Sequence, residues 1–283
     1  MTAPGRHAGL LANLPRDPSR LAPIVQGLLI YEHVAADFYG VPLSDKRRCE
    51  SHIRPVERLL DCILAMDDRP LEVARPASKR LVGICRHYAV LTVAMLRAQG
   101  VPARVRCGFG DYFDPASFED HWVCEYWNGS EHRWIIIDPQ FDDVWNSRLN
   151  IRHDVLDVPR DRFLTASDAW RACRSGTLDA SKFGIGFARL RGLWFISGSL
   201  VRDVAALNKI EILPWDVWGA QPLPNSSLNN DQLAFLDQLA ELTCRPDETF
   251  GALRALYQSD DRVRVPGSVF NALKQRPENV IAA

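Results

Sequence analysis

One apolar stretch of the chain predicts a helix that is packed on several sides. Residues 84 to 99 are hydrophobic almost throughout, and the interruptions are mainly Arg86, His87, Thr92, Arg97 and Gln99. A helix without a continuous polar face is buried inside a protein rather than lying on its surface. Gly100 and Pro102 follow as a stop signal, so we expect the helix to end near residue 99.

A strand and a hairpin are predicted after this helix. From residue 103 to residue 109, apolar and polar side chains alternate, which is typical of a half-buried strand. Two β-rich runs then flank Asn128-Gly129-Ser130, and Asn-Gly or Gly-Ser between such runs is a strong hairpin signal. A loop over residues 111–120 is expected between the strand and the hairpin.

Helical spacing dominates most of the remaining chain. Residues 21–39 and 44–66 have mixed apolar spacing near the helical period, whereas residues 67–82 are polar, interrupted by prolines and predicted to form a loop. Beyond residue 150 the signals favour helices again, including a small helical tail over 231–283. The order of helix, strand, hairpin and further helices predicts an α+β fold.

Composition and charge narrow the class of protein. The chain has 283 residues, of which 47% are hydrophobic and 24% charged, as is usual for a globular protein with a large core. Its 34 basic and 35 acidic residues give no electrostatic reason to expect a nucleic acid or an anionic membrane as a partner. No run of 18 apolar residues predicts a membrane span, and residues 1–20 do not resemble a signal peptide.

The cysteines favour a reducing compartment. There are seven of them, scattered along the chain, and an odd number fits free thiols in the cytoplasm better than a disulfide framework. Cys49 and His52 have a ligand-like spacing, but no second pair completes a zinc set. We therefore expect a cytoplasmic protein with no metal and no cofactor.

Three residues of the central patterns could form a catalytic set. Cys85 stands where a glycine-led turn enters the apolar helix, and the positive end of a helix dipole favours the thiolate. A two-residue turn at Gly129-Ser130 would set His121 opposite Asp138, with their Cβ atoms about 4.5 to 5.5 Å apart. A turn at Asn128-Gly129 would instead make Asp138 the diagonal neighbour of His121 on the same face.

Cysteine, histidine and aspartate in these positions could carry out acyl transfer through a thioester. The histidine takes the thiol proton, and the aspartate fixes its tautomer and steadies the imidazolium. The backbone N–H of Cys85 could also stabilise the oxyanion. Each residue has a structural interpretation as well: a core thiol, an incidental strand histidine and Asp-Pro turn chemistry.

Other polar residues near this set are interpreted as structural. His87 lies at i+2 on the helix, so its side chain points away from that of Cys85. Cys107 and Cys124 are interpreted as buried free thiols. The acidic residues of the loop before His121 are interpreted as solvated, with recognition of a cationic substrate as the alternative: Asp111, Asp114, Glu119 and Asp120.

The same blocks resemble the core of the transglutaminase-like superfamily. They are Gly83-Ile84-Cys85, the helix exit from Arg97 to Arg104, His121-Trp122 and Asp138-Pro139, within residues 81–140. Trp122 follows His121 directly, whereas the family usually has a small residue between them. The resemblance implies a papain-like α+β fold in which the cysteine helix packs against an antiparallel sheet.

The resemblance also implies roles for the three residues and a division of the chain. Cys85 would be the nucleophile, His121 the general acid/base and Asp138 the residue that orients it. We expect a catalytic domain with N-terminal helices over residues 1–225. Residues 226–283 would form a small helical C-terminal tail packed on that domain.

The predicted function is a cysteine-dependent acyl-transfer enzyme that acts on a small-molecule or peptide amide through a Cys85 thioester. Hydrolysis and transfer to an amine differ only in the second acceptor, and the sequence does not choose between them. One alternative is an inactive transglutaminase-like binding or scaffold protein. Another is an N-acyltransferase with a thioester donor, although no basic phosphate-binding stretch supports it.

Overall fold

The computed structural model describes residues 1–280 and divides into two compact units. The first unit comprises Met1–Val105 and Val123–Pro159, and the second comprises Arg106–Trp122 and the described residues from Arg160 onward. The chain passes between the units within two strands, β3 (Ala103–Gly110) and β4 (Phe118–Asn128). The predicted boundary between residues 225 and 226 concerns independent folding and stays a prediction.

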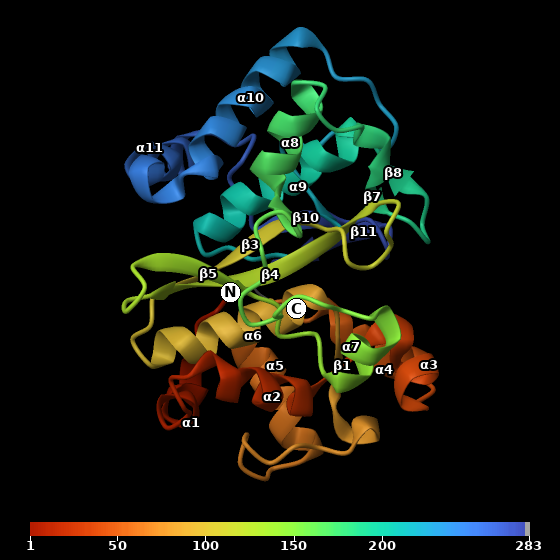
Figure 1. Ribbon diagram of the computed structural model, residues 1–283, viewed down its shortest axis with the longest axis vertical. Coiled ribbons are helices and arrows are strands. Elements are labelled where there is room, and N and C mark those ends of the chain that lie inside the picture. The colour runs from red at the N-terminus through yellow and green to blue at the C-terminus, as the bar shows by residue number, and fades with distance from the viewer. Residues whose placement is uncertain (281–283) are drawn as a thin grey trace. The chain divides into compact units, whose positions relative to one another are not determined.

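The first unit is mainly helical (Figure 1). Its central helix, α6, is buried along almost its whole length and packs against α1, α2 and α5, which confirms the predicted helix over 84–99. The α-helices of this unit are α1 (Ala8–Ala12), α2 (Pro18–Leu28), α3 (Ala35–Tyr39), α4 (Asp45–Arg48), α5 (Val56–Met66), α6 (Cys85–Ala98) and α7 (Asp143–Leu149). Its 3-10 helices are η1 (Gly5–His7), η2 (Glu32–Val34), η3 (Cys49–His52) and η4 (Ala77–Lys79).

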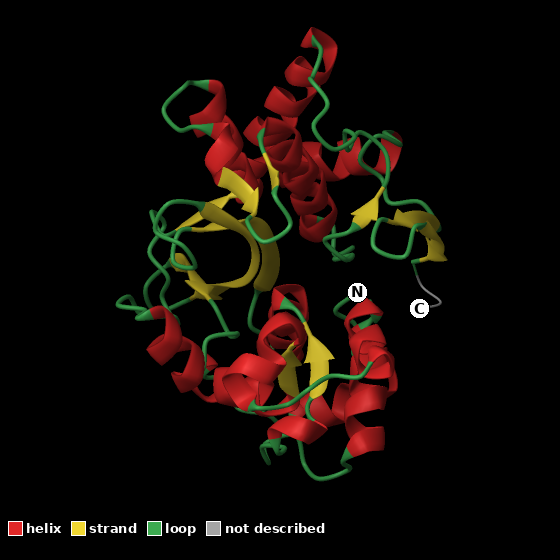
Figure 2. Ribbon diagram, turned by 90° about the vertical axis from the view of Figure 1, so that its right-hand side faces the viewer, coloured by secondary structure: helices red, strands yellow, loops and turns green. Residues whose placement is uncertain are grey.

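Two short parallel strands interrupt the predicted helical and loop segments. β1 (Leu29–Tyr31) pairs with β2 (Leu81–Gly83), and Figure 2 shows the pair among the helices of this unit. The predicted helix over 21–39 is therefore wrong at residues 29–31. The predicted helix over 44–66 is also broken, because Pro55 has an extended backbone and caps the start of α5.

The second unit packs α8, α9 and α10 together. Its helices are α8 (Ala166–Arg174), η5 (Ala180–Lys182), α9 (Leu193–Leu207), α10 (Asn230–Cys244) and α11 (Pro246–Ser259). Its strands are β6 (Phe163–Thr165), β7 (Phe183–Ile185), β8 (Leu190–Arg191), β9 (Asp216–Val217), β10 (Ser268–Asn271) and β11 (Arg276–Asn279). Side chains cap α8 and α10, since Thr165 accepts from the Asp168 N–H and Asn229 from the Gln232 N–H.

The tail prediction is only partly right. α10 and α11 are helical as expected, but β10 and β11 form an antiparallel pair where helix was predicted, and β10 also pairs with β9. The predicted tail runs to residue 283, and its last three residues lie outside the described residues.

The largest sheet has the strand order β6-β3-β4-β7-β8, with β5 (Arg133–Ile137) paired to β4. β4 pairs antiparallel with β5 and parallel with β7. The α+β class is thus confirmed.

β3 is not the half-buried strand that its alternation predicted. Arg106 lies on the expected polar face but is only 2% exposed. Its guanidinium makes two hydrogen bonds to the Asp203 carboxylate, at 3.1 and 2.9 Å, and Asp203 also accepts from the Cys107 N–H. A buried ion pair with these extra hydrogen bonds lets a charged residue sit where the strand is covered.

Candidate functional site

Cys85 is the first residue of α6 and follows β2 after a single residue. Its side chain is nearly buried, with 5% of the residue exposed. Gly83, two residues earlier, has no room for a side chain, because a Cβ there would lie 2.9 Å from the Cβ of His87. The glycine of the Gly-x-Cys motif therefore allows the close packing of β2 on the first turn of α6.

His87 fastens the start of that helix. Its Nδ1 accepts a hydrogen bond from the Ile84 N–H at 3.2 Å, and its Nε2 lies 3.0 Å from the Ile53 carbonyl oxygen, to which it donates. Burial lowers the pKa of His87 well below the ordinary value, with the charge of Arg86 acting in the same direction. The imidazole is therefore neutral, and its two nitrogens are used in holding the chain, as its structural interpretation requires.

The two arginines at the helix exit have structural partners. Arg97 donates to the Ala103 carbonyl oxygen at 2.8 Å, which ties the end of α6 to the start of β3. Arg104 pairs with Glu125 of β4 at 2.5 Å, and its guanidinium lies 3.8 Å from the centroid of the Trp134 ring. This part of the family motif holds the helix, the strand and the hairpin together.

Asp138 directly follows the last residue of β5 and is 1% exposed. Its backbone N–H donates to the Val155 carbonyl oxygen, and its Oδ1 accepts from the Gln140 N–H at 3.3 Å. The carboxamide of Gln140 is also buried, and neither of its polar atoms has a hydrogen-bond partner among residues 1–280. A buried amide without partners is costly, which makes Gln140 unusual among the neighbours of Asp138.

The hairpin exists, but both predicted registers are wrong. Asn128 pairs with Arg133, so a connection of four residues replaces the expected two, and the last pair toward His121 is Cys124 with Ile137. The Asn128 side chain accepts from the N–H groups of Ser130 and Glu131. The left-handed residue is His132, with a φ of 52°, and not Gly129. The Asn128 side chain thus organises a longer turn than the Asn-Gly pattern predicts.

His121 lies on β4, in the second unit, and is 1% exposed. Three aromatic rings of that unit approach the imidazole edge-on: Phe113 at 4.8 Å, Tyr112 at 6.0 Å and Phe163 at 6.4 Å between ring centroids. Cys85 and Asp138 belong to the first unit. The convergence of the three residues in one site stays a prediction.

The acidic residues before His121 have hydrogen-bond and ion-pair partners within the protein. Asp111 pairs with Arg162 at 2.7 Å, and Asp114 accepts from the Ser117 hydroxyl at 2.9 Å. The Glu119 carboxylate pairs with Arg191 and accepts from the Gly186 N–H. The Asp120 carboxylate accepts from the Ser199 hydroxyl at 3.2 Å. Internal partners explain these carboxylates without a cationic substrate.

Three of the other cysteines lie in surroundings that disfavour the thiolate. All seven are free thiols. Burial raises the pKa of Cys107 and of Cys124 well above the ordinary value, and it raises that of Cys173 to about 11. Because the thiolate is the reactive form, these three thiols are poor nucleophiles.

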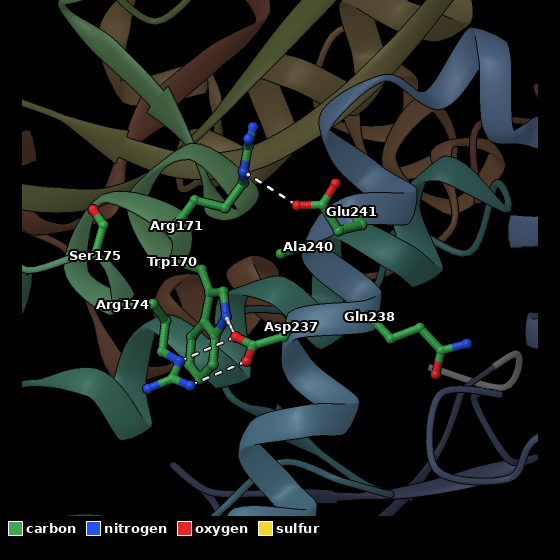
Figure 3. Close-up of a pocket in the computed structure, with 8 residues that line it drawn as sticks. All are labelled: Trp170, Arg171, Arg174, Ser175, Asp237, Gln238, Ala240 and Glu241. Atoms are coloured by element: carbon green, nitrogen blue, oxygen red, sulfur yellow. Dashed lines mark hydrogen bonds and ion pairs between the residues drawn. The ribbon is translucent and has the colours of Figure 1, made fainter.

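A surface pocket of about 470 Å³ lies between α8 and α10, away from the predicted catalytic residues along the chain. Figure 3 shows its charged side chains paired across the two helices. Asp237 accepts from Arg174 and from the Trp170 indole, and Arg171 lies 3.4 Å from Glu241. These pairs join the two helices and give the charged side chains of the pocket partners within the protein.

Two kinds of feature are absent from residues 1–280. No helix combines the length and the apolar character needed to cross a membrane. No group of three or more histidine, cysteine, aspartate or glutamate side chains in this range is arranged to hold a metal ion.

The sequence patterns did not identify three residues that lie next to His121 or Asp138, namely Tyr112, Phe113 and Gln140. Tyr112 and Phe113 fall in the predicted loop over residues 111–120, and Gln140 directly follows Asp138-Pro139. The only signal was their position, since the two aromatic residues precede His121 in a short loop and Gln140 follows Asp138 by two residues.

Comparison with known proteins supports the resemblance for the central part of the chain. Residues 64–139 match the transglutaminase-like superfamily. A stretch of 67 residues, 21% of this chain, is 37% identical to a protein-glutamine gamma-glutamyltransferase of Pseudomonas aeruginosa. It covers 10% of that enzyme, so the chain spans only about a tenth of its curated relative. These matches support a cysteine-dependent enzyme as the class of protein.

A solved structure from Cytophaga hutchinsonii, provisionally assigned as a cysteine protease, was also similar. It is 17% identical with a TM-score of 0.21, over 55% of this chain and 44% of that one. A similarity at this level is too weak to bear on the fold or the function of this chain.

Proposed function

We propose that the protein is a cysteine-dependent acyl-transfer enzyme in which Cys85 is the nucleophile, His121 the general acid/base and Asp138 the residue that orients the histidine. The observation that carries the proposal is the position of Cys85 as the first residue of a buried helix inside the matched segment. A thiol at this position feels the positive end of the helix dipole, which favours the thiolate.

Contacts within the first unit support the pairing of Cys85 with Asp138. Burial raises the pKa of Tyr88, three residues after Cys85, and the nearby charges of Tyr39 and Asp142 act in the same direction. The Tyr39 hydroxyl donates to Asp142 at 2.7 Å. The first turn of α6 and the segment that follows Asp138 are therefore neighbours.

The strand register supports a role for His121. Continuing the observed register by one pair would set Asp138 opposite Val123 of β4. Alternate residues of a strand share a face, so Val123 and His121 lie on the same face of β4. We therefore expect the Asp138 carboxylate within reach of the imidazole despite the changed turn.

The proposed reaction has two balanced steps. The Cys85 thiol gives its proton to His121, its sulfur bonds to the acyl carbon, and the carbon–nitrogen bond breaks as the imidazolium returns the proton to the departing amine. Water or an amine then attacks the thioester and gives a proton to His121. The thiolate leaves and recovers that proton.

The test is alkylation of the native protein with iodoacetamide from pH 5 to pH 9, with each cysteine followed by mass spectrometry. Cys85 should react fastest across this pH range, and His121→Ala should remove that advantage. Cys49 is the exposed reference, whereas the buried thiols Cys107 and Cys124 should stay unmodified. Asp138→Asn should give an intermediate rate.

Turnover is tested with a panel of amides and thioesters, in the presence and absence of an added amine. Cys85→Ala should abolish release of the amine or thiol, and thermal unfolding of the variant should match that of the native chain. Cys173→Ser is the matched control and should keep full turnover. If Cys85 is alkylated no faster than Cys49, the proposal is wrong and the inactive binding protein becomes the better account.

A further inference from the structure

A short loop holds two aromatic rings against His121. Residues 111–117 connect β3 to β4, and Tyr112 and Phe113 lie at its start, with ring centroids 4.9 Å apart. Both rings meet the His121 imidazole edge-on. Gly110 makes this possible, because a Cβ there would lie 2.7 Å from the Tyr112 ring and 3.1 Å from the Phe113 ring.

Hydrogen bonds fix both ends of this loop. Asp111 donates its N–H to the Arg162 carbonyl oxygen and pairs with the Arg162 guanidinium. At the other end, the Ser117 N–H donates to the Asp114 carbonyl oxygen, and the Ser117 hydroxyl lies 3.0 Å from Glu119. The aromatic pair is thus held in place before any substrate arrives.

The three rings around His121 differ in exposure. Phe163 is fully buried, whereas Tyr112 and Phe113 are half-buried. A bound molecule can therefore touch the loop rings but not Phe163. Aromatic faces and edges favour apolar and aromatic neighbours.

The chemistry of a general acid decides which part of a substrate meets these rings. His121, in the role proposed above, must come within about 2.6 to 3.2 Å of the nitrogen that leaves or attacks. Any group attached to that nitrogen then lies beside the side chains that surround the imidazole. The acyl side of the substrate lies on the far side of the reacting carbon.

We propose that Tyr112 and Phe113 form the wall of a subsite for the nitrogen-side group of the substrate, and that this subsite selects aromatic or other apolar amines. The inference rests on the proposed function, because it takes His121 as the proton donor to that nitrogen. It names the class of amine that leaves in hydrolysis or attacks in transfer.

Two alkylating reagents that differ only in the nitrogen substituent test the inference. Iodoacetamide and its N-phenyl analogue, iodoacetanilide, react by the same chemistry, and their rates at Cys85 are each divided by the rate at exposed Cys49. We expect the normalised preference for the anilide to be about 10-fold, and Phe113→Ala to lower it about 3- to 10-fold. Tyr112→Phe keeps the ring and should keep the preference.

Controls separate selectivity from general damage. Phe250→Ala makes the same change at a half-exposed site on α11 and should leave the preference unchanged. Phe113→Leu retains an apolar side chain and should lose less of the preference than Phe113→Ala. It replaces the alanine variant in the test if that variant does not fold. A merely looser His121 would slow both reagents equally and leave the ratio intact.

The outcomes distinguish the two proposals. If Cys85 reacts faster than Cys49 with both reagents but shows no anilide preference, or a preference that Phe113→Ala does not change, the subsite is refuted and the enzyme proposal stands. If Cys85 has no rate advantage over Cys49 with either reagent, both proposals fail together.

Discussion

At the scale of single residues, His87 makes the stability of the protein depend on pH. Its folded-state pKa lies below the unfolded value of 6.5, so the unfolded chain takes up the proton first as the pH falls. His87 therefore does not lower the free energy of unfolding above about pH 6.5. Below that pH its protonation in the unfolded chain lowers the free energy of unfolding by up to about 1.4 kcal/mol per pH unit. Urea unfolding at pH 7.5 and pH 5.5 measures this loss.

His87→Gln isolates the contribution of that histidine. A glutamine can accept from the Ile84 N–H and donate to the Ile53 carbonyl oxygen, but it does not titrate. The variant should lose less stability than the native chain between the two pH values. His132→Asn, at an exposed position with a positive φ, is the control and should behave as the native chain does. Equal pH dependence in His87→Gln and the native chain would show that His87 has the same pKa in the folded and the unfolded state.

Gln140 supplies a second prediction at this scale. Its buried carboxamide has no partner among residues 1–280, so it loses water on folding without gaining a hydrogen bond. Gln140→Met keeps the volume and should raise the free energy of unfolding by about 1 to 3 kcal/mol. Gln238→Met, at an exposed position on α10, should change it by less than about 0.5 kcal/mol. A loss of stability in Gln140→Met would mean that the amide is satisfied in solution.

At the scale of elements, the Arg104–Glu125 pair joins β3 to β4. Glu125 is 1% exposed, so removing Arg104 takes away the cation that lies 2.5 Å from a buried carboxylate. Arg104→Met should cost about 3 to 5 kcal/mol in unfolding free energy. The double variant Arg104→Met/Glu125→Met should be more stable than Arg104→Met, because it removes the buried carboxylate as well. Chemical denaturation of the two single variants and the double variant completes the cycle.

The elements also show how far the sequence could predict the fold. α6 was predictable because its apolar run and its stop signal at Gly100 and Pro102 are local. The pairing of β1 with β2 was not, since Leu29 and Leu81 are far apart in the chain and neither segment alternates. The burial of Arg106 was equally hidden, because its partner Asp203 lies 97 residues further on.

Local patterns identified the candidate residues, whereas their convergence in one site stays a prediction. Cys85, His121 and Asp138 stand out by their places at a helix start, on a strand and at a strand end. The hairpin register was not predictable, because a single side chain, Asn128, holds the longer turn. The two rings beside His121 come from a loop held by Arg162, which lies 51 residues beyond Asp111 and which no local pattern connects to it.

At the scale of the whole molecule, the remaining question is whether residues 226–283 form a separable tail. α10 buries Phe235, Leu236 and Leu239, and it packs against α8 and α9. Each such side chain contributes about 1.5 to 3 kcal/mol, so these three supply an amount comparable to the total stability of many domains. Arg106 of β3 also donates to the Thr243 carbonyl oxygen at 3.0 Å.

A chain truncated after residue 225 should therefore fail to unfold cooperatively in urea and should lose its near-ultraviolet circular dichroism. Leu239→Ala in the full chain is the graded control and should cost about 2 to 5 kcal/mol while keeping a cooperative transition. The reason for this expectation is that α10 packs against α8 and α9 and buries Phe235, Leu236 and Leu239. A truncated chain that unfolds cooperatively near the midpoint of the full chain would contradict this and establish residues 1–225 as an independent domain.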